Sequence, residues 1–329
     1  MEGPPADYPA LFREAALKLD VDAVVESYPH IEPAGFSRDK LRHIRQLLTR
    51  RSPDEIVFFC PGALEHFVEG ADMSFQFSAY RSWFDPGEMT VIAHPWTPTW
   101  SIADRPSLRW STKPPCTIGF MGSGYANSRV GRLAAQMPKF LRRYIVEGWL
   151  VRDIDRVAWL DEHKIPFRFL PTFPRAELLR EVEGAPDPGG VSKVEIIDTS
   201  GFDFSKTQKE AFAGHLARTT YVLCPRGCEN YSFRAYEALR FGRVPVILDT
   251  DMVFPTEIDW NEVAIIVDGR SPELVRQKIV EDYERRDAAA FLNRQQRAFE
   301  TSDSLDGDDW LTRAIAEAIA KVDDRKALF

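Results

Sequence analysis

Residues 221–251 read YVLCPRGCENYSFRAYEALRFGRVPVILDTD, and this segment gives the clearest indication of the fold. Its succession of apolar run, turn, helix-like stretch and second apolar run is typical of two parallel strands joined by a crossover helix. Gly242 comes directly after the helix-like stretch, where a left-handed residue commonly ends a helix. The strands are expected at 221–224 and 244–248, and the helix at 233–241.

The same alternation continues on both sides of this stretch. Short apolar runs bounded by turn residues suit strands that are buried on both faces, and the segments between them have helical spacing. We therefore expect an α/β fold with a parallel sheet and helices on both of its faces. Further strands are expected at 117–121, 167–170, 194–198 and 264–267, and further helices at 129–147, 206–218 and 272–286.

The N-terminal third is more varied. Apolar residues at helical spacing predict helices across 8–51, and two short apolar runs predict strands at 55–60 and 90–93. The prolines between 94 and 115 disfavour a long helix or a central strand, so this segment is expected to cross between domains. The expected parts are an N-terminal domain at 1–112, a C-terminal domain at 113–305, and a helix within 306–329 that packs back on the N-terminal domain.

The loop at 225–232 carries the first chemical signal. It leaves the carboxyl end of one strand and enters the N-terminus of a helix, and ligands of open α/β sheets bind beyond such strand ends. Backbone amides there, among them those of Gly227 and Ser232, and the helix dipole favour a phosphate. The guanidinium groups of Arg226 and Arg234 can add charge-assisted hydrogen bonds to it.

Glu237 lies three residues after Arg234, so the two side chains occupy neighbouring positions on one helix face. A carboxylate in that position can accept hydrogen bonds from two ribose hydroxyls. Together the loop and the helix predict a site for a nucleoside diphosphate. The alternative is an ordinary surface ion pair of Arg234 and Glu237, which would contribute little to stability.

Three motifs of this region resemble the donor-binding signature of the exostosin-domain glycosyltransferases. They are LCPRG at 223–227, SFRAYEA at 232–238 and GRVPVI at 242–247, with Asp249 beyond them. The residues FMG at 120–122, ahead of a basic helix-like stretch, are similar to the opening of the same domain.

This resemblance implies a GT-B fold, in which two Rossmann-like domains face each other across a cleft, with the N-terminal domain on the acceptor side. It implies that Arg226 and Arg234 hold the diphosphate of the donor and that Glu237 holds the ribose. Gly122 and Ser123 would let the opposing loop approach the phosphates closely. The resemblance also implies an inverting reaction, with a single displacement at the anomeric carbon.

Asp249-Thr250-Asp251 spells a DxD sequence at the end of a predicted strand. In another glycosyltransferase fold such a motif binds a divalent metal ion. In a GT-B domain the helix dipole and the arginines replace the metal, so no metal is expected. Asp249 is then expected to be structural or to face the donor.

Inverting transfer needs a general base that deprotonates the acceptor hydroxyl. It should come from the N-terminal domain, near the carboxyl ends of its strands. Glu65 and His66 follow the strand at 55–60, and His94 follows the strand at 90–93. Further candidates for the base are Glu69, Asp72 and Asp85.

Aromatic side chains gather in the same domain. They could form a platform on which a sugar ring stacks, or they could be ordinary packing. These residues are Phe75, Phe77, Tyr80, Trp83, Phe84, Trp96 and Trp100.

The composition is that of a globular protein, and the net charge of -8 disfavours general binding to nucleic acid or to anionic lipid. Four cysteines in 329 residues are too few for a disulfide framework, and their spacing matches no zinc site. The N-terminus has no apolar core of a signal peptide, and no stretch reaches the roughly 18 apolar residues of a membrane helix. A cytoplasmic protein without a transmembrane segment is therefore expected.

The expected function is inverting transfer of a sugar from a nucleoside-diphosphate donor, such as a UDP-sugar, to a carbohydrate or glycosylated acceptor. No separate cofactor is expected, and polysaccharide biosynthesis would suit such an enzyme. Two alternatives stay open. The first is a GDP-fucose-type transferase, and the second is a GT-B protein that binds a nucleotide or a carbohydrate without turnover. The sequence predicts no oligomeric state.

Overall fold

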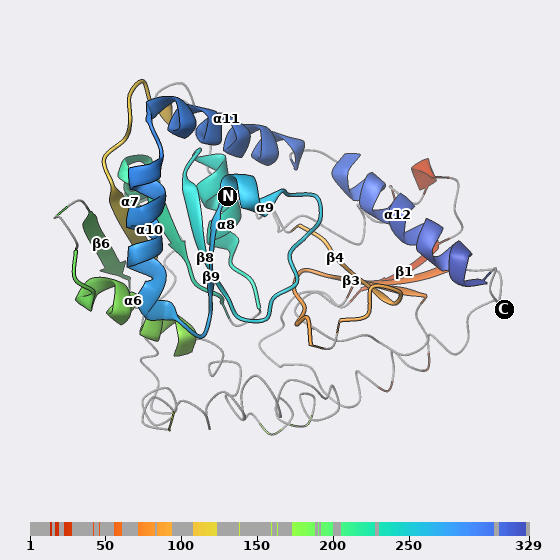
Figure 1. Cartoon of the computed structure of the whole chain (residues 1–329). Coiled ribbons are helices and arrows are strands. Elements are labelled where there is room, and N and C mark those ends of the chain that lie inside the picture. The colour runs from red at the N-terminus through yellow and green to blue at the C-terminus, as the bar shows by residue number, and fades with distance from the viewer. Residues whose placement is uncertain are drawn as a thin grey trace.

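The computed structural model shows two parallel sheets joined by a shared apolar core (Figure 1). Besides single residues elsewhere, it describes 23–27, 56–60, 72–82, 84–93, 108–123, 173–187, 192–199, 205–227, 230–305 and 309–326.

The first sheet has four parallel strands in the order β1-β2-β3-β4, which is also their order along the chain. All four residues of β3 are buried, including the polar Ser74 and Gln76, so this strand is enclosed on both faces. The strands are β1 (Ala23–Ser27), β2 (Ile56–Cys60), β3 (Met73–Gln76) and β4 (Met89–Val91).

The second sheet has five parallel strands in the order β6-β5-β7-β8-β9. The chain moves outward from β5 to β6 and then returns past β5 to β7, so the strand order reverses between β5 and β7. Ligands of open α/β sheets bind at such a reversal, outside the carboxyl ends of the strands. The strands are β5 (Thr117–Gly122), β6 (Lys193–Asp198), β7 (Tyr221–Cys224), β8 (Val244–Asp249) and β9 (Ile265–Asp268).

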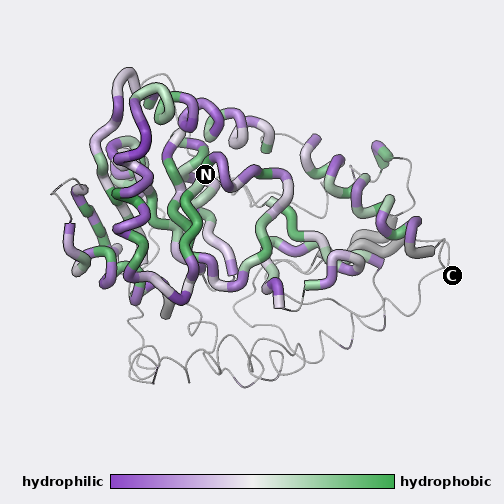
Figure 2. The backbone as a smooth tube through the Cα atoms, viewed as in Figure 1, coloured by the Kyte–Doolittle hydropathy of each residue, from purple (hydrophilic) through white to green (hydrophobic). Residues whose placement is uncertain are grey.

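Helices cover both faces of the second sheet, because the side chains of its strands alternate between two apolar clusters. In β7, Val222 and Cys224 pack with α7 and α8, whereas Tyr221 and Leu223 pack with α6 and α10. Figure 2 shows the hydrophobic strands enclosed by helices of mixed polarity. The helices are α6 (Phe173–Gly184), α7 (Lys206–Arg218), α8 (Phe233–Arg240), α9 (Trp260–Val263), the 3-10 turn η4 (Pro272–Leu274) and α10 (Val275–Arg285).

The last two helices connect the sheets. α11 (Ala288–Ser304) crosses one end of the second sheet, and α12 (Asp309–Lys326) continues to the first sheet, where Figure 1 shows it beside β1, β3 and β4. Leu311 and Ile315 of α12 belong to the same buried cluster as Phe75 of β3 and Ala235 of α8. One apolar core therefore runs from the first sheet through α8 to the C-terminal helix.

Most elements of the second sheet agree with the sequence predictions, from β5 and β6 to β9, as do α7, α8, α10 and α12. The prediction of helices across 8–51 is wrong at 23–27, where the valine-containing run AVVES forms β1. The sequence predictions lacked β3, α6 and α11. The strand predicted at 167–170 and the helix at 129–147 lie outside the described residues.

Candidate functional site

The polar groups predicted from the sequence lie at the carboxyl ends of β5 and β7, where the strand order reverses. β5 ends at Gly122, and β7 runs into the loop that enters α8 after Ser232. Ser232 has an extended backbone, and its side chain makes no capping hydrogen bond to α8. The first amides of this helix are thus not satisfied by the Ser232 hydroxyl, which suits a helix N-terminus that receives an anion.

Arg234, in the first turn of α8, reaches back to the end of β5. Its Nε and Nη2 donate to the carbonyl oxygen of Met121 at 3.1 and 2.5 Å, and its guanidinium carbon lies 4.5 Å from the ring centre of Phe120. Gly122 has a φ of +153°, and a Cβ atom at this position would lie 1.8 Å from Nη2 of Arg234. Gly122 therefore leaves the space that the guanidinium occupies.

Glu237 lies half-buried one turn further along α8. Burial raises the pKa of its carboxyl group, and the positive charge of Arg234 acts against that rise. Burial likewise lowers the pKa of Arg234, and the charge of Glu237 acts against that fall. The two groups influence each other's charge, as their spacing predicts, and they offer a cation and a hydrogen-bond acceptor side by side.

Arg226, in the loop after β7, is only 1% exposed. Its Nη1 donates to the hydroxyl of Tyr80 at 2.7 Å, and its guanidinium carbon lies 5.3 Å from the centre of the Tyr80 ring. A direct bond from this guanidinium to a diphosphate, which the sequence predicts, would require the enclosed contact with Tyr80 to give way. In this structure Arg226 is a residue that fixes the loop.

Arg175, at the start of α6, connects the two loops of the site. Its Nη1 donates to the carbonyl oxygen of Ser123 at 2.7 Å, and its Nε and Nη2 donate to that of Arg226 at 3.3 and 3.0 Å. A single guanidinium thus holds the segment after β5 against the loop after β7 with charge-assisted bonds. Arg175 could not be predicted from the sequence, because it lies outside the three motifs and no spacing rule connects it to them.

The loop before α8 is also closed by its own hydrogen bonds. The amide of Gly227 donates to the carbonyl oxygen of Tyr231 at 2.9 Å, so the expectation that this amide faces a phosphate is not met. The side chain of Asn230 is buried, and its Oδ1 accepts from the hydroxyl of Thr250 at 2.6 Å. Its Nδ2 donates to the carbonyl oxygens of Thr250 and Ala79, both at 3.3 Å.

A segment of the N-terminal part joins the site at this point. We call residues 77–82, which follow β3, the strap, because they lie along residues 249–253 after β8. Tyr80 and Met252 form an isolated antiparallel bridge between the two segments. The amide of Arg81 donates to the carbonyl oxygen after β8 at residue 251, at 2.8 Å. The carboxyl ends of β3 and β8 are thus connected directly.

The DxD sequence is part of this connection. Nη2 of Arg81 donates to Oδ2 of Asp249 at 2.9 Å, and Oδ1 of Asp249 accepts from the amide of Met252 at 3.1 Å. Oδ2 of Asp251 accepts from the amide of Ser82 at 3.2 Å, and Asp251 has a φ of +67°. Of the two roles expected for Asp249, this geometry supports the structural one.

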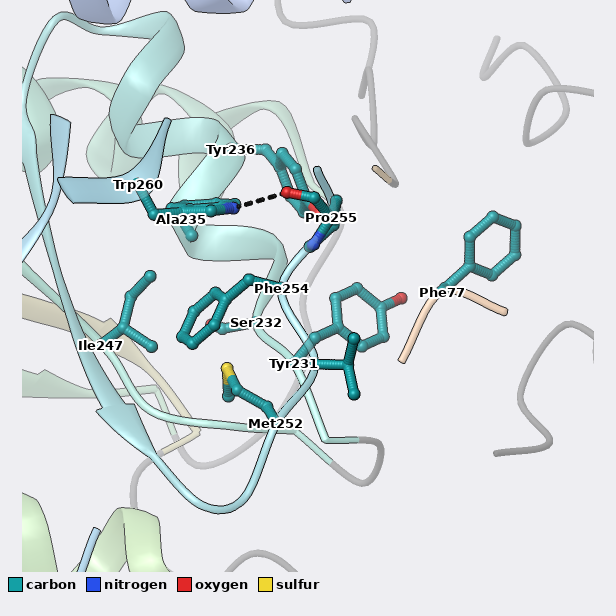
Figure 3. Close-up of a pocket in the computed structure, with 11 residues that line it drawn as sticks. Phe77, Tyr231, Ser232, Ala235, Tyr236, Ile247, Met252, Phe254, Pro255 and Trp260 are labelled. Carbon is teal, nitrogen blue, oxygen red and sulfur yellow. Dashed lines mark hydrogen bonds between the residues drawn. The ribbon is translucent and has the colours of Figure 1, made fainter. Parts of the chain in front are cut away.

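An apolar pocket lies beside the start of α8, and Figure 3 shows its lining. Ala235 and Tyr236 line it from the helix, whereas Arg234 and Glu237 do not, because they lie on another face of the helix. The indole nitrogen of Trp260 donates to the carbonyl oxygen of Pro255 at 3.2 Å. The other lining residues are Phe77, Tyr231, Ser232, Ile247, Met252, Val253, Phe254 and Pro255. This pocket adjoins the polar site but supplies no charged group to it.

The three main candidates for the general base, Glu65, His66 and His94, lie outside the described residues, as does Glu69, so they stay predictions. Asp72 is only 9% exposed. Asp85 is exposed, and its Oδ1 accepts from the amide of Gly87 at 2.8 Å within a turn. Both aspartates stay predictions for the base as well.

Of the two alternatives for the aromatic residues of the first domain, packing holds for three of them. Phe75, Phe77 and Tyr80 are 0%, 2% and 1% exposed, so they pack in the interior and have no face for a sugar. Trp83, Trp96 and Trp100 lie outside the described residues.

Metal ligands do not cluster in the part of the chain that the structure describes: no three His, Cys, Asp or Glu side chains are placed to hold an ion. Within the same part, none of the helices has the length and apolar character that crossing a membrane requires. Cys116 and Cys224 are buried thiols, and burial raises the pKa of both.

Residues 175–282 match the Exostosin GT47 domain. The match begins at Arg175 and continues through α7, β7, α8, β8 and β9 into α10, so it includes Arg234, Glu237 and the loop between β7 and α8. The exostosin resemblance predicted from the three motifs is confirmed, and this part of the chain carries an exostosin-type domain.

Relatives align with short segments of the chain. A "probable glucuronosyltransferase GUT1" of Oryza sativa subsp. japonica is 37% identical over 68 residues, which are 20% of this chain and 16% of the relative. An "exostosin-1 homolog" of Caenorhabditis elegans is 44% identical over 66 residues, 18% of this chain and 17% of the relative. A "probable beta-1,4-xylosyltransferase IRX10L" of Arabidopsis thaliana is 34% identical over 75 residues, which are 22% of this chain and 18% of the relative. The chain therefore matches less than a fifth of the length of each relative.

Two solved structures align with most of the chain at low similarity. A crystal structure of TarM superimposes with a TM-score of 0.39 and 11% identity, covering 95% of this chain and 58% of that one. An alpha-glucosyltransferase in complex with UDP and a 13-mer DNA superimposes with a TM-score of 0.36 and 13% identity, covering 95% and 84%. Two consecutive parallel sheets, the second with helices on both faces, agree with the GT-B fold that the sequence predicts.

Proposed function

We propose that this protein is a glycosyltransferase that moves a sugar from a nucleoside-diphosphate donor, such as a UDP-sugar, to a carbohydrate or glycosylated acceptor. The observation that carries the proposal is that the exostosin match includes α8 with Arg234 and Glu237, at the strand-order reversal where Arg234 packs against Gly122 of β5. The aligned relatives bear the names of glucuronosyl- and xylosyltransferases, which agrees with sugar transfer but differs in the sugar.

In the proposed complex the diphosphate lies over the start of α8. Ser232 and the first amides of the helix donate hydrogen bonds to the phosphate oxygens. Arg234, whose guanidinium lies at the end of β5, adds its positive charge. Glu237 accepts hydrogen bonds from the ribose hydroxyls. Gly122 and the backbone of Ser123 keep the opposite wall narrow, and Asp249 shapes the site only through the strap.

The proposed reaction is an inverting displacement without a metal ion. A base of the N-terminal domain, with Glu65, His66 and His94 as candidates, takes the proton of the acceptor hydroxyl. The acceptor oxygen then forms a bond to the anomeric carbon, while the bond from that carbon to the diphosphate oxygen breaks and its electron pair leaves with the diphosphate. Arg234 and the dipole of α8 stabilise the growing negative charge.

The experiment is a calorimetric titration of the protein with UDP and with GDP, followed by a panel of their sugars in a transfer and hydrolysis assay. At a concentration of about 100 times the Kd, a true donor nucleotide raises the free energy of unfolding by about 2.7 kcal/mol, because it binds the folded state alone. Arg234→Lys keeps the positive charge but loses the planar guanidinium, so the affinity of this variant for the donor nucleotide should fall. Arg285→Lys, at an exposed arginine of α10, serves as the matched control.

The outcomes separate the alternatives. Binding of GDP in preference to UDP would favour a GDP-fucose-type transferase, and nucleotide binding without transfer or hydrolysis would favour a binding protein without turnover. Failure of both nucleotides to bind would refute the proposed donor site. A cytoplasmic location and the absence of a separate cofactor are part of the same proposal, and fractionation and activity in the presence of EDTA test them.

A further inference from the structure

The loop that would receive the donor is held from outside its own domain. Tyr80, in the strap, comes from the segment after β3 of the first sheet, whereas Arg226 belongs to the loop after β7 of the second sheet. The hydroxyl of Tyr80 accepts from Nη1 of Arg226 at 2.7 Å, and the two side chains are each only 1% exposed. A buried guanidinium that loses an acceptor leaves a donor unsatisfied, so this contact is costly to break.

The backbone of Arg226 is held by hydrogen bonds as well. Its carbonyl oxygen accepts two bonds from Arg175, as described above, so the residue is held by its side chain and by its main chain at once. Tyr80 holds the side chain of Arg226, and Arg175 of α6 holds its carbonyl oxygen. Little freedom is left for the loop at the point where it turns away from β7.

Further along the same loop, Asn230 repeats the pattern. Its amide nitrogen donates to the carbonyl oxygen of Ala79, the residue before Tyr80, at 3.3 Å. The strap therefore touches the loop at both of its described ends, next to β7 and next to α8. These two contacts give the N-terminus of α8, and Arg234 within it, a defined position.

We propose that Tyr80 is a positioning residue for the donor site: acting through Arg226, this residue of the first sheet sets the shape of the nucleotide-binding loop on the second. The inference rests on the proposed function for its ligand, but the positioning itself is a property of the empty protein. Nucleotide affinity thus depends on a side chain that belongs to the opposite part of the molecule and does not touch the nucleotide.

The test compares Tyr80→Phe with Tyr221→Phe. Tyr221 is a matched control because it is also fully buried, lies on β7 itself, and donates its hydroxyl to Asp282 at 2.9 Å, away from the loop. Both variants lose one buried hydroxyl and keep the ring. Hydrogen exchange of the amides in residues 227–235 is measured on the empty proteins, and the Kd for UDP is measured by calorimetry.

In Tyr80→Phe we expect exchange in 227–235 to become about tenfold faster, because the loop opens more often. The Kd for UDP should rise by a smaller factor, because only the closed form binds and its population falls less than exchange rises. Tyr221→Phe should change neither quantity, whatever it does to the melting temperature. Equal exchange in Tyr80→Phe and wild type, or equal losses in both variants, would overturn the inference. If wild type binds neither UDP nor GDP, the proposed function fails, and the exchange rates alone still decide whether Tyr80 positions the loop.

Discussion

Gly122 offers a direct test of how closely Arg234 packs on the end of β5. In Gly122→Ala the new Cβ would lie 1.8 Å from Nη2 and 2.8 Å from Cζ of Arg234, so the guanidinium has to leave. It then loses its two hydrogen bonds to Met121, each of which contributes about 1.5–3 kcal/mol for a charged donor. Alanine at a φ of +153° adds strain of about 1–3 kcal/mol. We expect a loss of about 3–5 kcal/mol, since the side chain regains some contacts elsewhere.

Two other glycines separate the clash from the strain. Gly190 has a φ of +65° and nothing within 4 Å of a Cβ, so Gly190→Ala carries strain alone and should cost about 1–2 kcal/mol. Gly184, the last residue of α6, also has nothing within 4 Å and no positive φ. Gly184→Ala should be neutral or stabilise by about 0.5–1 kcal/mol.

The assay is urea unfolding of the three variants and wild type, with the Kd for UDP as the second measurement. Gly122→Ala should show the largest fall in the free energy of unfolding and a weaker affinity for UDP, whereas the two control variants keep the affinity. If Gly122→Ala costs no more than Gly190→Ala, the guanidinium of Arg234 does not occupy the end of β5, and the geometry of the proposed site is incorrect.

The remaining predictions concern three titratable or charged groups. Glu237→Gln should weaken UDP binding about 10- to 100-fold, because it removes a charged acceptor. The empty protein should become no less stable at neutral pH, because burial raises the pKa of Glu237 and its ionised form therefore costs stability as pH rises. Calorimetry and thermal unfolding check the two effects, with the half-exposed Glu281→Gln as the control. Burial lowers the pKa of His215 from 6.5 to about 4, so acidification from pH 6.5 to pH 4 should remove up to about 3 kcal/mol of stability. In urea unfolding at several pH values, His215→Gln should flatten this dependence of stability on pH, whereas the exposed His163→Gln should keep it. Arg81→Ala should cost about 1 kcal/mol in low salt, since its guanidinium is half-exposed, and less in about 0.5 M salt, which screens its two ion pairs.

Each of these has a contrary result. A large loss of stability in Glu237→Gln with unaltered UDP affinity would assign the carboxylate to packing. An unchanged slope between about pH 4 and pH 6.5 in His215→Gln would show that this imidazole is not the group that titrates. A salt-independent loss in Arg81→Ala would attribute its effect to the hydrogen bond with the carbonyl of Met252 instead of to the aspartates.

The second sheet could be predicted because its strands are short apolar runs with turn residues at both ends, and each pair is separated by a helical segment. In the first sheet, the apolar runs at 55–60 and 90–93 predicted β2 and β4, whereas β1 and β3 were not predicted. β1 is a valine-containing run inside a segment of helix-like composition, and β3 is only four residues long. The alternation of Met73 and Phe75 with Ser74 and Gln76 is typical of a strand with one exposed face, whereas in the structure both faces of β3 are buried.

For the site, local spacing predicted that Arg234 and Glu237 share a helix face, and the loop after β7 pointed to the correct strand ends. The partners of Arg226 could not be found in this way. Tyr80 is 146 positions away in the chain and Arg175 is 51, so only the tertiary fold brings them together. The DxD sequence suggested chemistry, but the structure shows Asp249 bonded to Arg81.

Because Phe75, Ala235 and Ile315 share one apolar cluster, the exostosin-like stretch is not a portable module. A protein cut down to residues 175–282 would retain Arg234 and Glu237, but it would expose residues of α8 that belong to this shared cluster, and it would also lack β5. Any fusion or truncation that aims to transplant nucleotide recognition from this chain therefore has to carry the first sheet and the C-terminal helix along with it.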